Sequence, residues 1–255
     1  MGLEILRVEN IEEKYQAQNG EVTALENISF SMDKGEFMSI VGPSGCGKST
    51  LLSILAGLLK PTAGAVYVKG EKVEGISGHI GYMLQKDSLM DWRTIYSNVL
   101  FGLEVRHMLT QETVDRTVQL LKTYGLYEFK DKYPAQLSGG MRQRAALIRT
   151  LAINPDILLL DEAFSALDYQ TRLTVTEDVY RILKQEAITT VMVTHDIPES
   201  ISMGDRILVL TARPRVKEIL DIDFGMDHRT PLSCRNNPKF GQYFDHIWKE
   251  LGMHA

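Results

Sequence analysis

The sequence predicts an α/β fold with a mostly parallel central sheet. The run Ile157–Leu160 is apolar throughout, and Phe37–Val41 and Thr189–Thr194 are nearly as rich in apolar and β-branched residues. Runs of this kind are typical of parallel strands that are covered on both faces. A helical pattern over residues 110–130 separates two of them, and helices between strands favour a parallel sheet. At 255 residues, the chain is long enough for one large domain or for one domain with a subdomain.

The composition narrows the classes of function. The formal net charge is −5 and the pI is near 5.7, which argues against a nucleic-acid binder with a broad basic face. Cys46 and Cys234 are too few for a disulfide framework, so we expect a reducing compartment. The N-terminus lacks a signal-peptide pattern, and no apolar run approaches the ~18 residues that span a bilayer. If the protein acts at a membrane, we expect other chains to supply the membrane part.

The chain begins with two predicted strands, Leu3–Ile11 and Val22–Met32, and a polar loop at 16–21 between them. Apolar residues that recur along each segment indicate these strands. Tyr15 lies just before the loop and has two interpretations. Its ring can stack on an adenine base, or it can be a half-buried tyrosine at a strand end.

A glycine-rich loop follows the strand at Phe37–Val41 and leads into a leucine-rich helix. Its pattern is G-x-x-x-x-G-K-S-T, in which the glycines let backbone N–H groups close around phosphate oxygens. The start of the helix adds unpaired N–H groups and a positive dipole end. Lys48 is placed to contact β- and γ-phosphates, and the Ser49 hydroxyl to ligate Mg²⁺. We therefore predict a nucleotide site made of Gly42, Pro43, Ser44, Gly45, Cys46, Gly47, Lys48, Ser49 and Thr50.

Short strands and a helix are predicted after this loop. Ala65–Val68 and Ile80–Leu84 have strand patterns, and Gln85 follows the second of them. The helix predicted over 110–130 has Thr110 as its N-cap.

An irregular stretch, residues 86–99, lies between Gln85 and that helix. It carries the large apolar residues Leu89, Met90 and Trp92. These side chains can fill the core, or they can form a docking surface for a partner.

A second glycine-containing helix start lies at Ser138–Gly140. The helical residues that follow, at 145–152, would give this segment the unpaired N–H groups of a helix N-terminus. The segment can be a second anion cradle in which Ser138 bonds a phosphate oxygen. The alternative is an ordinary helix cap that contains glycine.

Polar side chains are predicted at the carboxyl ends of the central strands, where parallel sheets bind ligands. Asp161 ends its strand and is placed to hold Mg²⁺, and Glu162 is placed to orient or deprotonate an attacking water. The alternative for these two acids is a helix N-cap. His195 follows another central strand and joins Gln85 and Glu162 at this edge, so we expect it to contact a γ-phosphate.

The order of these features resembles the ATP-binding cassette of ABC transporters. The matching features are Tyr15, the loop at 42–50, Gln85, Leu137–Gly140, Asp161–Glu162 with Ser165–Asp168, and His195. The resemblance covers roughly residues 3–225. It implies a P-loop NTPase fold of the ABC ATPase type, with an N-terminal antiparallel β-subdomain and a helical subdomain at about 86–155.

The resemblance also implies a role for each of the site residues. Two ATP molecules with Mg²⁺ would lie between two copies of the chain in a head-to-tail dimer, with Tyr15 stacked on adenine. Hydrolysis would depend on Glu162, His195, Lys48 and Gln85. The metal would be contacted by Ser49, Gln85 and Asp161. The ATP of the second copy would be bound by Leu137, Ser138, Gly139, Gly140 and Met141, and the dimer contact would include Ser165, Ala166, Leu167 and Asp168.

A narrower resemblance is to the ATPases of nitrate-, sulfonate- and taurine-type importers. It lies in residues 89–99, Leu137–Arg144 and Thr211–Pro214, and related systems take up thiamine-precursor pyrimidines or bicarbonate. Met141 stands where glutamine is more usual in the general pattern, which leaves the backbone cradle intact. The resemblance implies two permease subunits docked near Gln85–Phe101 and an indirect link to an extracytoplasmic solute-binding protein. It also implies a peripheral position on the cytoplasmic face of the cell membrane, and no nucleic-acid partner.

Two other functions compete with this one. A non-transport ABC ATPase would act on nucleic acid or ribosomes, but the sequence has no long coiled-coil insertion and no basic patch. A phosphate-loop kinase would leave Ser138–Gly140 and His195 without a role.

The tail, residues 226–255, is predicted as a polar linker at 226–236 followed by an amphipathic helix that starts at Asn237–Pro238. The apolar face of that helix carries Phe240, Phe244, Ile247, Trp248 and Leu251. We expect this face to pack on the domain, and a partner or regulatory role is the alternative.

Overall fold

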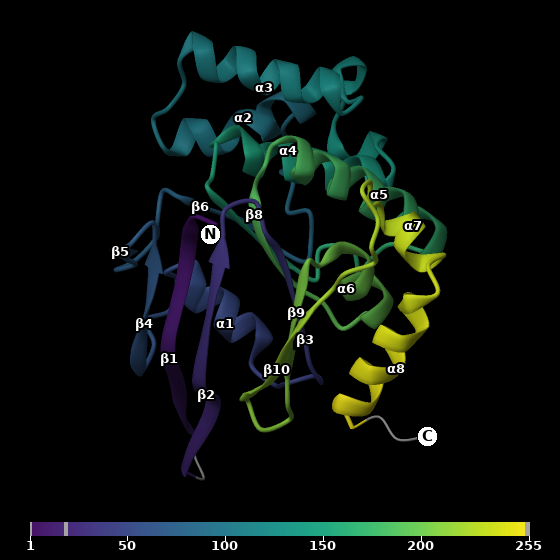
Figure 1. Cartoon of the computed structure of the whole chain (residues 1–255). Helices are drawn as coiled ribbons and strands as arrows, with labels where there is room; N and C mark the ends of the chain where they lie inside the picture. Colours follow the sequence, from purple (N-terminus) through teal and green to yellow (C-terminus); the bar gives the residue numbers. More distant parts are fainter. Residues whose placement is uncertain (1, 18–19, 253–255) are drawn as a thin grey trace.

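The computed structural model describes residues 2–17 and 20–252, which form two sheets with helices around them (Figure 1). The smaller sheet is antiparallel with strand order β2-β1-β4-β5, and the larger has the order β10-β9-β3-β8-β7-β6. In the larger sheet β10 runs antiparallel to β9, and the remaining pairs are parallel. The predicted α/β fold with a mostly parallel central sheet is confirmed.

The elements alternate between strands and helices through most of the chain. The strands are β1 (Glu4–Ala17), β2 (Gly20–Asp33), β3 (Phe37–Val41), β4 (Ala63–Val68), β5 (Glu71–Lys72), β6 (Ile80–Met83), β7 (Ile157–Asp161), β8 (Thr189–Val193), β9 (Arg206–Leu210) and β10 (Val216–Asp221). The helices are α1 (Lys48–Leu55), α2 (Ile95–Val105), α3 (Gln111–Thr123), α4 (Gly139–Ala152), α5 (Tyr169–Gln185), α6 (Ile197–Met203), α7 (Pro231–Arg235) and α8 (Lys239–Glu250), and 3-10 turns occur at Tyr127–Phe129 and Pro134–Gln136.

The centre of the large sheet is formed by β3, β8 and β7. All residues of β3 and β8 are buried, as are the first four of β7. These strands lie in parallel register, with Met38 beside Val191 and Leu160 beside Met192. Burial on both faces accounts for the continuous apolar runs in the sequence.

Helix α1 lies between the two sheets (Figure 1). Its residues Leu51, Leu52 and Leu55 are fully buried in one cluster with side chains from both sheets, among them Leu6 of β1 and Ile40 of β3. The start of α1 is therefore held firmly at the carboxyl end of β3.

Helices α2, α3 and α4 gather at one end of the molecule (Figure 1). They share a core in which Ile95 and Val99 of α2, Leu121 of α3 and Leu147 of α4 are fully buried. None of the helices in the described part of the chain is long and apolar enough to cross a membrane.

The prediction of a polar loop at 16–21 is wrong for the residues of this segment that the structure describes. β1 continues to Ala17 and β2 starts at Gly20, and Gln16 pairs with Glu21 across the hairpin. Residues 18–19 lie outside the described residues. An ion pair between Lys14 and Glu21 at 2.9 Å joins the two strands, so cross-strand pairing outweighs the polar composition.

Two further expectations are corrected. The stretch 86–99 is not irregular throughout, because α2 begins at Ile95 with the Thr94 hydroxyl capping Ser97 N–H. The linker expected at 226–236 contains α7, which Thr230 caps and in which Pro231 occupies the first turn.

The C-terminal helix packs on the domain, as expected. Ile247 is fully buried in a cluster with Ile201 of α6 and Val209 of β9, and Phe240, Phe244 and Leu251 pack against the same cluster. Trp248 is 41 % exposed and stacks on Phe244 instead.

Replacing the buried anchor of α8 tests its contribution to stability. We expect Ile247→Ala to lower the free energy of unfolding by about 2–4 kcal/mol, because it leaves a cavity in a packed cluster. The measurement is urea denaturation, with Lys249→Ala on the exposed face of α8 as the control. Equal midpoints for the two variants would show that α8 adds no stability.

Candidate functional site

The loop at 42–50 joins the carboxyl end of β3 to the start of α1, as the sequence predicts. Its shape depends on two glycines that allow close approach. A Cβ on Gly42 would lie 2.5 Å from Cys46 Sγ, and a Cβ on Gly47 would lie 2.2 Å from the carbonyl oxygen of Ala24 in β2. Gly47 also has φ = 87° and caps α1. The loop is thus packed closely around its own Cys46 side chain and against the backbone of β2.

Lys48 folds back over this loop. Its side chain is only 7 % exposed, and Nζ donates to the carbonyl oxygens of Gly42 at 2.8 Å and Pro43 at 2.9 Å. The third proton of the ammonium faces the thiol of Cys46, with Nζ 3.8 Å from Sγ, and sulfur is a weak acceptor that an anion held by the loop would displace. The backbone N–H groups at the start of α1 lie beside this charge, which is the arrangement that binds phosphate.

Asp161, at the end of β7, meets two hydroxyl groups. Ser49 Oγ donates to Oδ1 at 3.3 Å, and Tyr82 OH donates to Oδ2 at 3.1 Å. Burial raises the pKa of Asp161, the charge of Glu162 raises it further, and the hydrogen bonds from Tyr82 and Ser49 oppose the shift.

The donor set around Asp161 fits Mg²⁺. It offers a carboxylate and a hydroxyl, and Mg²⁺ takes oxygen ligands. No group of three or more His, Cys, Asp or Glu side chains that could hold a metal occurs in the described residues. A Mg²⁺ ion held by Ser49 and Asp161 would therefore draw its other ligands from phosphate and water, as this ion usually does.

Gln85, Glu162 and His195 come together at adjacent strand ends. His195 Nδ1 lies 3.2 Å from Glu162 Oε2, and Gln85 Nε2 lies 3.4 Å from the same oxygen. Gln85 also donates to Ser165 Oγ at 3.1 Å. The order β8-β7-β6 makes these neighbours, because parallel strands align their carboxyl ends.

Glu162 itself has a strained backbone. Its φ is 45°, which is uncommon for a residue other than glycine. Its N–H donates to the carbonyl oxygen of Val193 at 2.9 Å, so the end of β8 holds the turn in place. Such strain is concentrated at functional sites.

The segment Ser138–Gly140, predicted as a second anion cradle, forms the start of α4. Ser138 Oγ accepts from Met141 N–H at 3.3 Å, which makes Ser138 the N-cap. A Cβ on Gly140 would lie 2.9 Å from Val175 of α5. In the described part of the chain, no hydrogen bond joins this segment to the loop at 42–50, so the two glycine-containing helix starts are separate.

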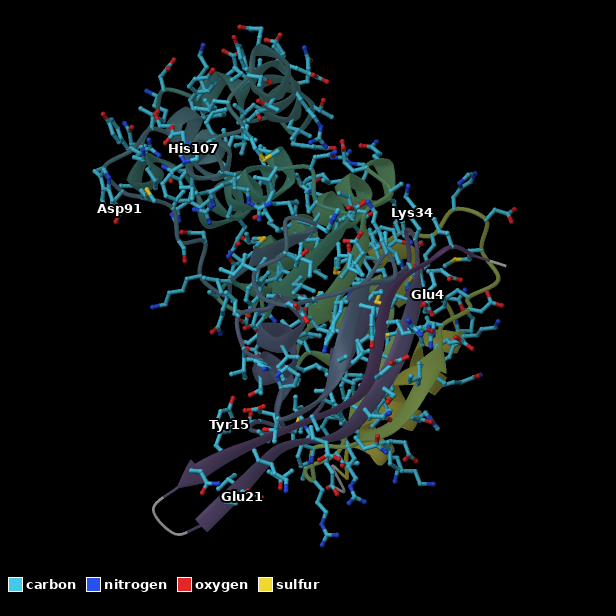
Figure 2. All side chains as sticks on the ribbon, turned by 90° about the vertical axis from the view of Figure 1, so that its left-hand side faces the viewer. Glu4, Tyr15, Glu21, Lys34, Asp91 and His107 are labelled. Atoms are coloured by element: carbon cyan, nitrogen blue, oxygen red, sulfur yellow. The ribbon has the colours of Figure 1, made fainter. Side chains whose placement is uncertain are left out.

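Tyr15 lies on the hairpin formed by β1 and β2 (Figure 2). It pairs with Val22, and the preceding pairs lead back to Leu25, whose side chain borders Gly47. The hairpin therefore brings Tyr15 to the neighbourhood of the phosphate loop, with its side chain 43 % exposed.

The segment Ser165–Asp168 leads from Glu162 into α5. Ser165 Oγ donates to the carbonyl oxygen of Glu162 at 2.9 Å, and Asp168 Oδ1 caps α5 by accepting from Thr171 N–H. Arg172 donates to the carbonyl oxygen of Leu167 at 2.9 Å, and to Asp196 beside His195 at 3.1 Å.

The large apolar residues after Gln85 were expected either to fill the core or to form a docking surface, and they differ in burial. Leu89 is buried in the core, whereas Trp92 is 78 % exposed.

Tyr82 and Arg172 are not among the site residues predicted from the sequence. Tyr82 lies in the strand that ends at Gln85, and burial together with the Asp161 carboxylate raises the pKa of its hydroxyl, which keeps it a donor. The predicted strand placed Tyr82 near the correct edge. Arg172 gave no signal, because its partners are backbone carbonyls and one carboxylate brought together by folding.

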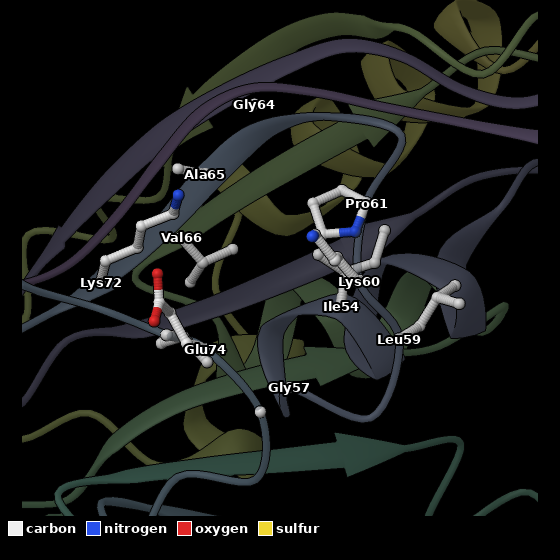
Figure 3. A pocket seen from close by; sticks show the side chains of 12 residues that line it. Ile54, Gly57, Leu59, Lys60, Pro61, Gly64, Ala65, Val66, Lys72 and Glu74 are labelled. Atoms are coloured by element: carbon white, nitrogen blue, oxygen red, sulfur yellow. The ribbon is translucent and has the colours of Figure 1, made fainter.

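A hollow of about 410 Å³ lies elsewhere, at the C-terminal end of α1 (Figure 3). Lys60 and Pro61 border it on one side, and Lys72 and Glu74 on the other. Since α1 begins at the phosphate loop and ends here, the helix separates this hollow from the candidate site.

Comparisons with known proteins agree with the site. The family model described as ABC transporter matches residues 25–165. The uncharacterized ABC transporter ATP-binding protein YtlC of Bacillus subtilis (strain 168) is 46% identical over 98% of this chain and 96% of its own. The nitrate import ATP-binding protein NrtD of Synechocystis sp. is 38% identical over 95% of this chain and 93% of its own. Other relatives are named for taurine and aliphatic sulfonates import.

A solved structure has the same fold. It is the dimeric, post-hydrolysis state of the ATP-binding cassette MJ0796 bound to ADP and Pi. It is 32% identical in sequence, covers 86% of this chain and 99% of its own, and has a TM-score of 0.72.

Two alanine variants test the shape of the phosphate loop. We expect Gly47→Ala to lower affinity for ATP at least about tenfold, because its Cβ would collide with Ala24 and displace the start of α1. Gly45→Ala is the matched control: its φ is also positive, at 80°, but its Cβ meets nothing within 4 Å. The measurement is binding of a fluorescent ATP analogue. Equal losses in the two variants would mean that φ alone, and not contact with β2, sets the loop.

Proposed function

Because the chain belongs to the ABC transporter family and is an ATPase of its importer-type branch, we propose that it drives solute import as a head-to-tail dimer. Each ATP would lie between the loop at 42–50 of one copy and Ser138–Gly140 of the other. The dimer would dock on two permease subunits at the cytoplasmic face of the cell membrane.

The observation that carries the dimer is the pair of separate cradles. Within the described residues, Ser138 forms its hydrogen bond with Met141 N–H and none with the loop at 42–50, and His195 is 55 % exposed at this edge. Gln85 is exposed as well. A second copy in the opposite orientation would cover this edge with its own Ser138–Gly140, and the symmetric arrangement uses both cradles of both chains.

The proposed chemistry is in-line attack of water on the γ-phosphate. Glu162 would accept the proton of the attacking water, and its contact with His195 Nδ1 at 3.2 Å would orient the carboxylate. Lys48, His195 and Ser138 of the second copy would stabilise the charge that develops on the phosphate oxygens. Ser49 and Asp161 would hold Mg²⁺, which supplies further neutralisation of phosphate charge when bound.

The permease would dock on an apolar groove beside the Gln85 segment. The groove measures about 370 Å³ and runs between the end of α1 and α2, and its lining includes Leu58, Ile76, Met90, Phe101 and Val105. Trp92, two residues beyond the lining residue Met90, is 78 % exposed, and Gln85, three residues before the lining residue Ser88, lies 3.4 Å from Glu162. A short apolar segment of a membrane subunit fits such a surface better than a charged partner.

The solute would be a small molecule or ion of the nitrate, sulfonate or taurine type, as in the names of the relatives. Thiamine-precursor pyrimidines and bicarbonate are the alternatives. A solute-binding protein outside the membrane would deliver it to the permease.

Glu162→Gln tests the hydrolytic role and the dimer together. We expect phosphate release to fall about 10²- to 10⁴-fold, because the amide cannot accept the proton, while ATP binding persists. In size-exclusion chromatography the variant should shift from monomer to dimer on addition of ATP. The control is Glu128→Gln, an exposed glutamate in the 3-10 turn at Tyr127–Phe129. Normal turnover in Glu162→Gln would contradict the base assignment, and a monomer at saturating ATP would contradict the dimer.

Trp92→Ala tests the docking surface. The variant is coexpressed with its cognate membrane subunits. We expect its affinity for them to fall at least about tenfold, because an exposed tryptophan at an interface often contributes much of the binding energy. Trp248→Ala, an exposed tryptophan on α8, is the matched control. Equal co-purification of the two variants with the membrane subunits would remove Trp92 from the interface.

A further inference from the structure

The turn that follows Gln85 is tightly built. Asp87 Oδ1 accepts from Leu89 N–H at 3.2 Å, and Ser88 has φ = 47°. Two arginines of α4 contact this turn. Arg142 and Arg149 lie about two helical turns apart and therefore project from the same face of α4.

Arg149 holds the backbone of the turn. Its Nη1 donates to the carbonyl oxygen of Ser88 at 2.7 Å, and its Nη2 donates to that of Asp87 at 2.8 Å. The planar guanidinium thereby fixes both carbonyls relative to α4.

Arg142 connects the turn to the second cradle. Its Nε donates to Asp87 Oδ2 at 3.1 Å, and its Nη1 donates to the carbonyl oxygen of Leu137 at 2.9 Å. Leu137 immediately precedes Ser138, the N-cap of α4. One side chain therefore spans from the segment of Gln85 to the residue that enters the second cradle.

The charge of Asp87 is needed to hold Arg142 there. A guanidinium near the N-terminus of α4 meets the positive end of the helix dipole, which disfavours it. The Asp87 carboxylate offsets this repulsion and favours the same end of the helix. Without that charge, Arg142 would lose its ion pair and keep only the hydrogen bond to the Leu137 carbonyl oxygen, which holds it less firmly.

We propose that Asp87 and Arg142 are a positioning pair that couples the two cradles of one chain. This inference rests on the proposed dimer. When Gln85 contacts the ATP of its own chain, the turn at Asp87 and Ser88 is fixed in position. Arg142, which bonds this turn and Leu137, then fixes Ser138 in the orientation that binds the ATP of the second copy. Linkage is reciprocal, so ATP at the second cradle also favours ATP at the first.

The test measures coupling and not activity alone. In a Glu162→Gln background, Asp87→Asn keeps the side-chain acceptor for Leu89 N–H but removes the charge, and Arg142→Gln removes both contacts. We expect each to raise the ATP concentration for half-maximal dimer at least about fivefold. Binding of a fluorescent ATP analogue to the dilute monomer should not change. With Glu162 intact, the Hill coefficient of hydrolysis should fall toward one.

A double-variant cycle tests whether the two residues act as one unit. Asp87→Asn with Arg142→Gln should be no worse than Arg142→Gln alone, because that variant has already lost the ion pair together with the Leu137 contact. Arg142→Lys should restore little over Arg142→Gln, since its ammonium keeps the charge but lacks the planar fork whose separate nitrogens reach Asp87 and Leu137 at once. Additive losses, or full function in Arg142→Lys, would overturn the pair.

The matched control is the ion pair of Asp178 and Arg181 on α5, whose atoms are also 3.1 Å apart. Arg181→Gln removes this pair and leaves the contact of Asp178 with Arg144 of α4 in place, so it should leave the dimer curve unchanged. If the Glu162→Gln protein alone forms no ATP-dependent dimer, the proposed function fails. If it dimerises and Asp87→Asn leaves the curve unaltered, only this inference fails. Should Arg142→Gln not fold, Asp87→Asn decides the question.

Discussion

The parallel register of β6, β7 and β8 is the constraint on which the candidate site depends. It sets the ends of three strands side by side, and the residues just beyond them are Gln85, Glu162 and His195. Gln85 and His195 both contact the same carboxylate oxygen of Glu162, so a small shift of any of the three strand ends would break one of these contacts. The continuous burial of β7 and β8 resists such shifts, since slippage would expose apolar side chains or move them into occupied space.

A second constraint comes from α1 and its loop. The helix is buried between two sheets, so the loop is fixed at both ends. Gly47 allows the backbone of β2 to approach the loop closely. The Lys48 ammonium also holds the loop, by donating to the carbonyl oxygens of Gly42 and Pro43. The cradle is thus shaped before any phosphate arrives, which lowers the cost of ordering on binding. The second cradle belongs to a different cluster of helices and depends on α4 and α5 for its shape.

The sequence allowed the fold class and the chemistry of each motif to be predicted, because these depend on local patterns. Apolar runs identify β3 and β7, and a glycine spacing identifies the phosphate loop. Contacts between segments that are distant in the chain could not be predicted, because local patterns do not record them. The bond from Tyr82 to Asp161 and the bridge from Asp87 through Arg142 to Leu137 join residues far apart in the chain. The hairpin around Gln16 and Glu21 was missed for the same reason, since cross-strand pairing decided its conformation.

The central claim is that each working site takes one cradle from each of two chains. The most direct measurement is ATP hydrolysis after mixing two inactive variants, Lys48→Ala and Ser138→Glu. The first lacks the loop lysine and the second repels phosphate at the other cradle. A mixed dimer would hold one intact site, so we predict recovery of up to about a quarter of the normal rate, because half of randomly paired dimers are mixed. If mixing restores no activity while each variant still folds and dimerises, the two cradles do not form a shared site.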